Sequence, residues 1–204
     1  MTTADEERLS LFLDTASKKL ALELRKGRKY YRIALGDPKK SLERTHLGIA
    51  MALDAMNARL DEVKAFYCLL GPGSNTGIRL GLTIPRTLYA FDSTIQLYGI
   101  GTLALMLQED ETGYAALSDR NGNLFVAHME NGKVIEEKIE KKDFASLPEG
   151  LFLVEDADML AKEALKGRKI KEVDMLESMV RHKDAFFDYS KKEESYLPHY
   201  AFRI

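Results

Sequence analysis

The spacing of hydrophobic positions in the first half of the chain switches repeatedly between a strand-like and a helical period. Three short strand-like runs come first, followed by a helical period, a buried apolar run, a second helical period, and a last strand and helix. The predicted elements are strands at 9–14, 20–25 and 30–34, a helix at 42–60, a strand at 65–70, a helix at 76–91, a strand at 95–99 and a helix at 102–108. The three opening strands predict an antiparallel meander.

Two Asn-Gly pairs, at 121–122 and 131–132, mark the second half. They lie between alternating segments, where Asn-Gly is the strongest short-range signal for a hairpin. The predicted elements are strands at 114–118, 124–128, 133–139 and 151–154, and helices at 157–166 and 175–187. Because both halves open with a meander, we expect an internally duplicated fold of two α/β lobes, residues 1–108 and 109–204.

The two longer helices of the first half carry apolar side chains on two faces. At about 100° per residue, the expected core-facing stripe of the first helix is Leu42, His46, Ile49, Leu53, Met56 and Leu60. The opposite face of a surface helix should be charged, but small and apolar residues occupy it in both helices. These residues are Leu47, Gly48, Met51, Ala55 and Ala58 in the first helix and Ile78, Leu82 and Tyr89 in the second. They predict a helix-mediated contact with a partner chain, and cover by the second lobe is the alternative.

A glycine-rich segment between residues 71 and 82 joins the buried strand to the second of these helices. It is not a P-loop, because no lysine follows its second glycine, and not a dinucleotide fingerprint, because Thr76 stands where the third glycine belongs. Pro72 also removes an amide that an anion site would use. Turn chemistry alone favours a tight strand-to-helix turn with Ser74 or Thr76 as N-cap.

The run Gly-Pro-Gly-Ser-x-Thr-Gly-x-Arg-x-Gly-Leu in this segment resembles the signature of the TsaB (YeaZ) family of bacterial proteins. The matching residues of the motif are Gly71, Pro72, Gly73, Ser74, Thr76, Gly77, Arg79 and Gly81. Other family features follow in order, including the strand end Asp14-Thr15, the segment Tyr98-Gly99-Ile100 and the ending Pro198-His199-Tyr200. The resemblance is strongest from about residue 11 to about residue 107.

Three segments depart from the family pattern. Pro85 interrupts the second helix and predicts a kink or break there. The segment ending at His46 reads Leu-Glu-Arg-Thr-His in place of the usual His-Ser-Glu, and Ala201-Phe202 stands where a shorter ending is typical.

The resemblance implies an α/β fold of the actin-like, ribonuclease H-like (ASKHA) type, with two lobes whose mixed sheets open with antiparallel meanders. It also implies membership of the complex that makes threonylcarbamoyladenosine in tRNA. In that complex TsaB is a non-catalytic partner of a TsaD-like catalytic homologue, a TsaE-like protein supplies an ATPase, and TsaB forms a homodimer when alone. The helices flanking the glycine-rich turn are the family's dimerisation helices.

The residues themselves offer little for catalysis. A helical metal site needs two ligands three or four residues apart, but Ile49 and Ala50 occupy those positions after His46. We therefore expect no catalytic residue and no metal, with ATP and Mg²⁺ entering only within the complex. Asp14 and Thr15 could instead face a nucleotide, and the alternative function is a small actin-fold ATPase or phosphotransferase that uses them with the glycine-rich turn.

Charge and cysteine content limit the kinds of partner and the kinds of protein that the chain can represent. Thirty Lys and Arg against 32 Asp and Glu leave a net charge of -2, which excludes a global field for nucleic acid or an anionic membrane. Ten basic residues against three acidic ones between Lys18 and Arg44 leave two interpretations, a sheet edge protected by lysines or a tRNA-facing patch. Any tRNA contact is expected to be indirect or weak.

The lone Cys68 excludes a disulfide framework. The polar start and the short apolar runs favour a cytoplasmic protein without a membrane partner.

Overall fold

The computed structural model describes residues 8–36 and 41–190. The sequence features at Pro198-His199-Tyr200 and Ala201-Phe202 lie outside these residues. The described residues form two compact units, one made of 8–36, 41–100 and 186–190 and the other of 101–185. This division differs from the expected one at 108/109 in two ways. Helix α4 (Thr102–Leu107) packs on strands of the second unit, so the boundary lies before it. The chain later returns to the first unit, where β11 (Phe187–Asp188) pairs antiparallel with β5 (Gln96–Ile100).

The first unit is built on a sheet of six strands in the order β11-β5-β4-β1-β2-β3. Its other strands are β1 (Ser10–Asp14), β2 (Leu20–Lys26), β3 (Lys29–Gly36) and β4 (Ala65–Leu69). Strands β1, β2 and β3 form the predicted antiparallel meander, whereas β1, β4 and β5 run parallel. The sheet is therefore mixed, as expected for this fold class.

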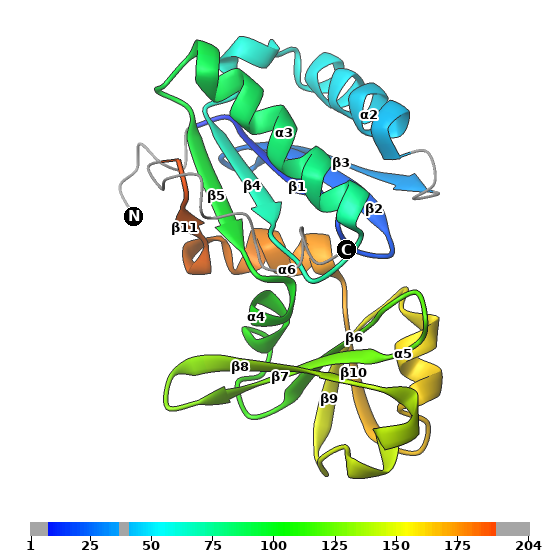
Figure 1. The fold of residues 1–204 in the computed structure, drawn as a ribbon. Coiled ribbons are helices and arrows are strands. Elements are labelled where there is room, and N and C mark those ends of the chain that lie inside the picture. The colour runs from blue at the N-terminus through cyan, green and yellow to red at the C-terminus, as the bar shows by residue number, and fades with distance from the viewer. Residues whose placement is uncertain (1–7, 37–40, 191–204) are drawn as a thin grey trace. The chain divides into compact units, whose positions relative to one another are not determined.

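Two helices, α2 (Ser41–Met56) and α3 (Asn75–Phe91), cover one face of this sheet (Figure 1). A short 3-10 helix, Leu60–Glu62, follows α2. Core residues beneath the helices include Leu13, Leu22 and Cys68, which stand in register on adjacent strands and are fully buried. The opposite face carries Phe12, Tyr67 and Tyr98, whose rings stack at centroid distances of 4.4 and 4.8 Å.

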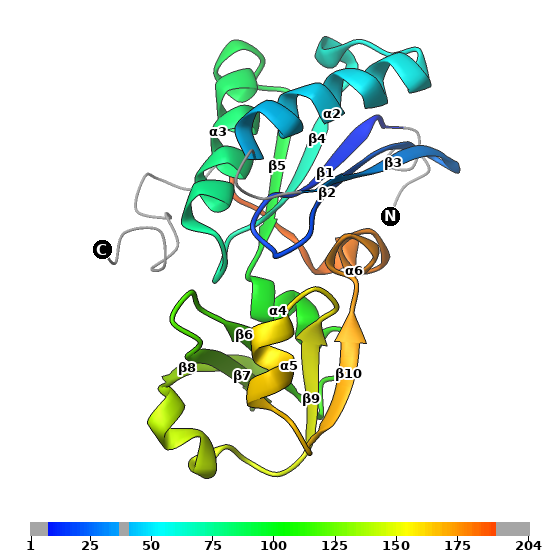
Figure 2. The same ribbon diagram turned by 90° about the vertical axis from the view of Figure 1, so that its right-hand side faces the viewer.

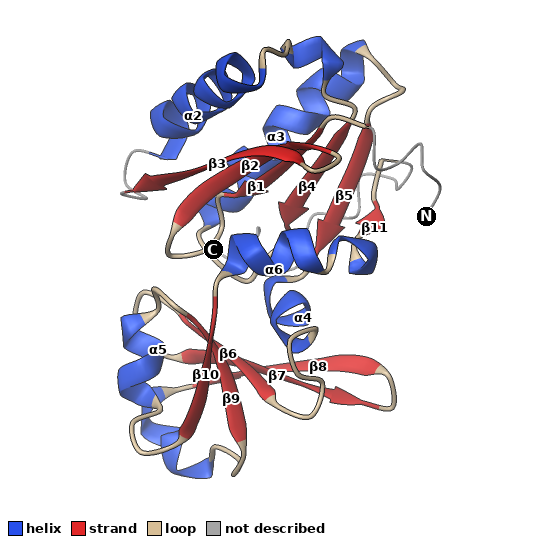
Figure 3. Ribbon diagram, turned by 180° about the vertical axis from the view of Figure 1, so that it is seen from behind, coloured by secondary structure: helices blue, strands red, loops and turns tan. Residues whose placement is uncertain are grey.

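The second unit repeats the topology of the first. Its strands are β6 (Tyr114–Ser118), β7 (Leu124–Glu130), β8 (Lys133–Ile139), β9 (Leu151–Glu155) and β10 (Lys169–Val173). They are ordered β10-β9-β6-β7-β8, with an antiparallel meander followed by parallel pairs, so each strand has a counterpart in the first sheet (Figure 3). Asn131 and Gly132, both at positive φ, make the predicted turn between β7 and β8. The expected duplication is thus present in the sheet order.

The helices of the second unit are shorter than those of the first. They are α4 (Thr102–Leu107), α5 (Met159–Ala164) and α6 (Met175–Arg181), with 3-10 helices at Lys141–Ser146 and Lys183–Ala185. Helix α5 packs on the sheet beside β6 (Figure 2). The predicted helix at 175–187 is wrong beyond Arg181, and β10 and β11 were not predicted. Strand β10 reads Lys-Ile-Lys-Glu-Val, in which the adjacent Lys171 and Glu172 break the alternation, and β11 has only two residues, so neither carries a strong strand pattern.

Pro85 does not interrupt its helix, so the predicted break is wrong. Helix α3 continues from Asn75 to Phe91 with Pro85 inside it. A proline leaves the carbonyl four residues earlier without its amide donor. Here the Cys68 thiol donates to the Gly81 carbonyl oxygen over 3.0 Å. A side chain of the underlying strand thus replaces the backbone hydrogen bond that Pro85 removes.

Candidate functional site

The stripe of α2 that faces the core differs from the predicted one. Its buried residues are Ser41, Thr45, Gly48, Ile49, Ala52 and Met56. The prediction is wrong for Leu42, His46 and Leu60, which are exposed. Gly48 supplies the reason: a Cβ there would overlap the Leu35 side chain and lie 3.1 Å from that of Leu22. Because Gly48 has no side chain, the face of α2 that carries it can approach β2 and β3 closely. Leu42 and Leu60 consequently point away from the sheet.

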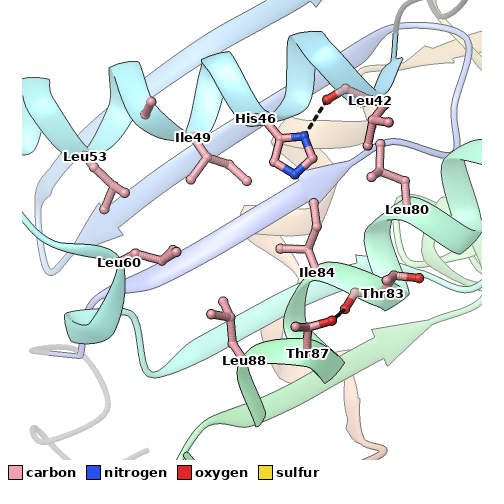
Figure 4. A pocket seen from close by; sticks show the side chains of 11 residues that line it. Leu42, His46, Ile49, Leu53, Leu60, Leu80, Thr83, Ile84, Thr87 and Leu88 are labelled. Atoms are coloured by element: carbon pink, nitrogen blue, oxygen red, sulfur yellow. Dashed lines mark hydrogen bonds between the residues drawn. The ribbon is translucent and has the colours of Figure 1, made fainter. Parts of the chain in front are cut away.

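The displaced leucines line an apolar groove between α2 and α3, with a volume of about 440 Å³ (Figure 4). The lining residues are Leu42, His46, Ile49, Ala50, Leu53, Leu60, Leu80, Thr83, Ile84, Thr87 and Leu88. The polar members bond within their own helices, Thr87 to the Thr83 carbonyl at 2.9 Å and His46 Nδ1 to the Leu42 carbonyl at 2.9 Å. Contiguous exposed apolar surface of this kind marks an interaction site.

The predicted partner-interface residues divide into two groups. Leu47 and Met51 are 62% and 42% exposed, Ala55 is exposed, and Ala58 and Tyr89 are half-buried. Gly48, Ile78 and Leu82 are buried in the core of the first unit, so their assignment to an outer contact face is wrong. The predicted grouping by helix face is therefore only partly right, because Gly48 is buried while Leu47, Met51 and Ala55 are exposed. The helix also ends at Met56, so Ala58 and Leu60 lie beyond it.

The glycine-rich turn closes onto the end of β1. A Cβ on Gly77 would overlap the Thr15 carbonyl oxygen, one on Gly73 would lie 2.5 Å from the Ala16 carbonyl oxygen, and one on Gly81 would lie 2.7 Å from Thr15 Oγ1. These three glycines recur every four residues and so place one side of α3 directly against the strand end. Their role in this structure is close backbone approach.

Hydrogen bonds reinforce this approach. The Ser74 amide donates to the Ala16 carbonyl over 2.8 Å, and the Thr15 hydroxyl donates to the Gly77 carbonyl over 2.7 Å. Ser74 is the N-cap of α3, because its Oγ accepts from the Gly77 amide at 3.2 Å, and Thr76 lies exposed in the first turn. The Ser74 and Gly77 amides, which a phosphate would need, are therefore used within the protein.

The other motif residues lie around this contact. Gly71, Pro72 and Gly81 are buried, whereas Gly73, Thr76 and Arg79 are exposed. The structure thus brings the two motifs that the sequence singled out, Asp14-Thr15 and the glycine-rich turn, together at one end of the sheet.

Asp14 is 1% exposed and caps the turn that follows β1. Its Oδ1 accepts from the Ser17 amide at 3.1 Å, and its Oδ2 accepts from the Ser17 hydroxyl at 2.5 Å. These bonds agree with a turn-capping role for Asp14. A nucleotide-facing role for Asp14 and Thr15 stays a prediction.

The second unit contains an equivalent connection that the sequence analysis missed. Ser118 ends β6, the counterpart of β1, and Asp158 is the N-cap of α5, the counterpart of α3. Asp158 accepts from the Ser118 amide at 2.7 Å, from its hydroxyl at 2.6 Å and from the Ala161 amide at 3.0 Å. In both units, a hydroxyl at the end of the first strand thus bonds to the helix that follows the fourth strand.

A second feature missed in the sequence is a charged cluster around Glu109. Its carboxylate accepts from Arg181 at 2.9 Å and lies 3.1 Å from His182 Nε2. Burial raises the pKa of Glu109, but Ser178, Arg181 and His182 lower it more, so it lies below its ordinary value. Arg181 and His182 stand more than 70 residues from Glu109 in the chain, so no local motif could reveal a cluster that ties the end of α4 to α6.

No group of three or more His, Cys, Asp or Glu with the geometry of a metal site occurs among residues 8–36 and 41–190. His46 lies in the α2–α3 groove, His128 lies on β7 beside the Tyr114 ring, and His182 pairs with Glu109. In the same described residues, no helix has the length and apolar character needed to span a membrane.

Comparison with known proteins identifies the fold. No family model and no curated protein matches the sequence. A solved structure described as an uncharacterized protein with similarity to peptidase YEAZ from Pseudomonas aeruginosa aligns with a TM-score of 0.63 at 18% identity, over 87% of this chain and 92% of that one. YeaZ from Pseudomonas aeruginosa aligns with a TM-score of 0.63 at 16% identity, over 91% and 97%. At such identities the likeness concerns the fold, and this chain has the two-lobed α/β fold of YeaZ.

Proposed function

We propose that this chain, folded like YeaZ, is a non-catalytic partner subunit in the transfer of a threonylcarbamoyl group to adenosine of tRNA. In this proposal it pairs with a TsaD-like catalytic homologue, a TsaE-like ATPase joins them, and the isolated chain pairs with itself. The apolar groove between α2 and α3 is the observation that carries the proposal.

The groove fits a pair of helices from a partner. Leu42 and Leu60 are 54% and 38% exposed at its two ends, and burial of such side chains contributes about 25 cal/mol for each Å² removed from water. Leu47 and Met51 extend the exposed apolar surface along α2. Two helices with an apolar groove between them can receive a similar pair, which gives a four-helix contact between homologous lobes.

The glycine-rich turn supports the same proposal. Because Gly73, Gly77 and Gly81 hold α3 against β1, they also determine where α3 stands relative to α2 and hence the shape of the groove. In this interpretation the motif is needed for a docking surface. The alternative, an ATPase or phosphotransferase centred on Asp14, is less well supported, because both carboxylate oxygens of Asp14 bond to Ser17.

Two matched leucines test the docking surface. Leu42 in the groove and Leu160 on α5 are exposed to nearly the same degree, 54% and 52%. Affinity for the TsaD-like homologue of the same organism would be measured by calorimetry with Leu42→Asp and Leu160→Asp. We expect Leu42→Asp to weaken binding by a factor of about 100 or more, because it buries an unpaired charge in the contact, and Leu160→Asp to bind like the wild type.

Circular dichroism and light scattering complete the test. Both variants should keep the wild-type spectrum, since both side chains are exposed, and Leu42→Asp alone should shift any homodimer to monomer. Equal affinities for the two variants would reject the groove as the interface. Turnover of ATP with Mg²⁺ by the isolated chain, abolished by Asp14→Ala, would instead favour the phosphotransferase.

A further inference from the structure

The hairpin formed by β2 and β3 is strongly basic in an acidic protein. It carries Arg25, Lys26, Arg28, Lys29 and Arg32 against a single acid, Glu23, while the whole chain has a net charge of -2. All five cations fall within eight consecutive residues around the turn. We call residues 25–32 the basic hairpin.

The geometry of the basic hairpin leaves positive charge at the surface. Glu23 is completely buried and pairs with both Arg25 and Arg32 at 2.6 Å, so one negative charge faces two guanidinium groups. Lys26 and Arg28 are exposed in and beside the turn, and no ion pair engages either of them within the described part of the chain. The positive charge of the turn is therefore not balanced by an acidic neighbour.

An aromatic ring lies among these cations. Tyr30 is 54% exposed, and the Arg25 guanidinium lies over its ring, 4.6 Å from the centroid. The two residues are direct cross-strand partners, so the sheet register fixes their proximity. An exposed tyrosine surrounded by Arg and Lys is the arrangement that binds a nucleic acid, because the cations neutralise phosphates and the ring stacks on a base.

The duplicated fold provides an internal comparison. Strands β7 and β8 form the equivalent hairpin, and β8, like β3, stands at the end of its sheet order. That hairpin carries Lys133 and Lys138 against Glu130, Glu136 and Glu137. An edge strand of this topology is thus protected by charges of mixed sign, so protection against sheet extension does not require the positive excess of the basic hairpin.

We propose that the basic hairpin binds RNA, with Lys26 and Arg28 on the phosphate backbone and Tyr30 stacked against an unpaired base. The choice of RNA over another polyanion rests on the proposed function, in which the substrate of the complex is a tRNA. An anionic membrane fits less well, because the turn Lys26-Gly27-Arg28-Lys29 offers no apolar side chain for insertion.

The test compares two exposed hairpin lysines in the full-length chain. Binding of a fluorescein-labelled, unmodified tRNA transcript would be followed by fluorescence anisotropy at several salt concentrations. We expect Lys26→Glu to raise Kd about tenfold at low salt and to reduce the slope of log K against log salt by about 0.7 to 0.9 for each phosphate that is no longer neutralised. Lys133→Glu, at the β7–β8 turn, changes the net charge equally and should stay within about twofold of the wild type.

Tyrosine variants separate stacking from charge. Tyr30→Ala should raise Kd at least about fivefold with an unchanged salt slope, and Tyr30→Phe should restore wild-type binding because the ring is kept. Equal losses for Lys26→Glu and Lys133→Glu, or no RNA binding by the wild type at low salt, would overturn the proposal. Binding to phosphatidylserine vesicles in place of RNA would also overturn it.

The test of RNA binding and the test of partner binding can succeed or fail independently. Lys26→Glu should still bind the TsaD-like homologue, and Leu42→Asp should still bind the transcript. Loss of RNA binding in Lys26→Glu together with normal partner binding in Leu42→Asp would reject the partner-subunit proposal and leave the RNA surface in place.

Discussion

At Gly77 the backbone of one element occupies the space that a side chain of another would need. The Thr15 carbonyl oxygen stands where a Cβ would be built, and the Thr15 hydroxyl bonds to the Gly77 carbonyl. A backbone atom cannot rotate away as the end of a side chain can. The position therefore tolerates no side chain unless α3 moves from β1.

We predict that Gly77→Ala destabilises the protein by about 2–4 kcal/mol, measured by urea unfolding, because α3 must shift off the end of β1. Thr76→Ala, next to it but exposed and not the N-cap, should change the free energy of unfolding by less than about 0.5 kcal/mol. A small loss for Gly77→Ala would contradict the close approach.

At the scale of elements, a side chain of strand β4, Cys68, supplies a hydrogen bond that Pro85 removes from helix α3. Burial raises the pKa of the Cys68 thiol to about 12, so the proton that it donates to the Gly81 carbonyl stays in place at neutral pH. The strand thus supplies what the proline withholds. This explains a proline in the middle of a 17-residue helix.

Cys68→Val should therefore cost about 1–2 kcal/mol beyond its packing effect, since it leaves a buried carbonyl without a donor. In a Pro85→Ala background the restored amide can bond to Gly81, and we expect the cost of Cys68→Val to fall by about 1 kcal/mol. Urea unfolding of the four proteins in this cycle measures the coupling. An equal cost in both backgrounds would show that the thiol does not replace the missing amide.

At the scale of the whole molecule, both units have the same order of strands apart from β11, and they differ in the helices that follow the meander. The first unit inserts the 16-residue helix α2 after its meander, where the second has only a short 3-10 helix, and this difference creates the α2–α3 groove. The chain then returns to the first unit after residue 185, where Tyr189 is 3% exposed and its amide donates to the Leu97 carbonyl over 2.8 Å.

We predict that Tyr189→Ala lowers the free energy of unfolding by about 3 kcal/mol, because it empties a buried aromatic site. Hydrogen exchange should show the loss in β4 and β5, with β6 and β9 unchanged, since the two units have separate cores. Tyr189→Phe keeps the ring and should cost far less. A uniform loss of protection in both sheets would contradict separate cores.

The sequence by itself determined the local elements and the duplicated pattern, because turn residues and hydrophobic period act over a few neighbouring residues. The meanders, both long helices and the Asn131-Gly132 turn all follow from such signals. The resemblance of the glycine-rich segment also pointed to the fold that YeaZ shares.

Only the tertiary structure decided which face of α2 meets the sheet. Apolar residues lie on more than one face of α2, so its sequence is compatible with either orientation. The choice depends on Gly48, which meets Leu35 and Leu22 from strands of the opening meander. The contact between Thr15 and Gly77, the Cys68 bond to Gly81 and the Glu109 cluster depend equally on the packing of distant segments. No local pattern encodes them, because their energy arises only when those segments come together.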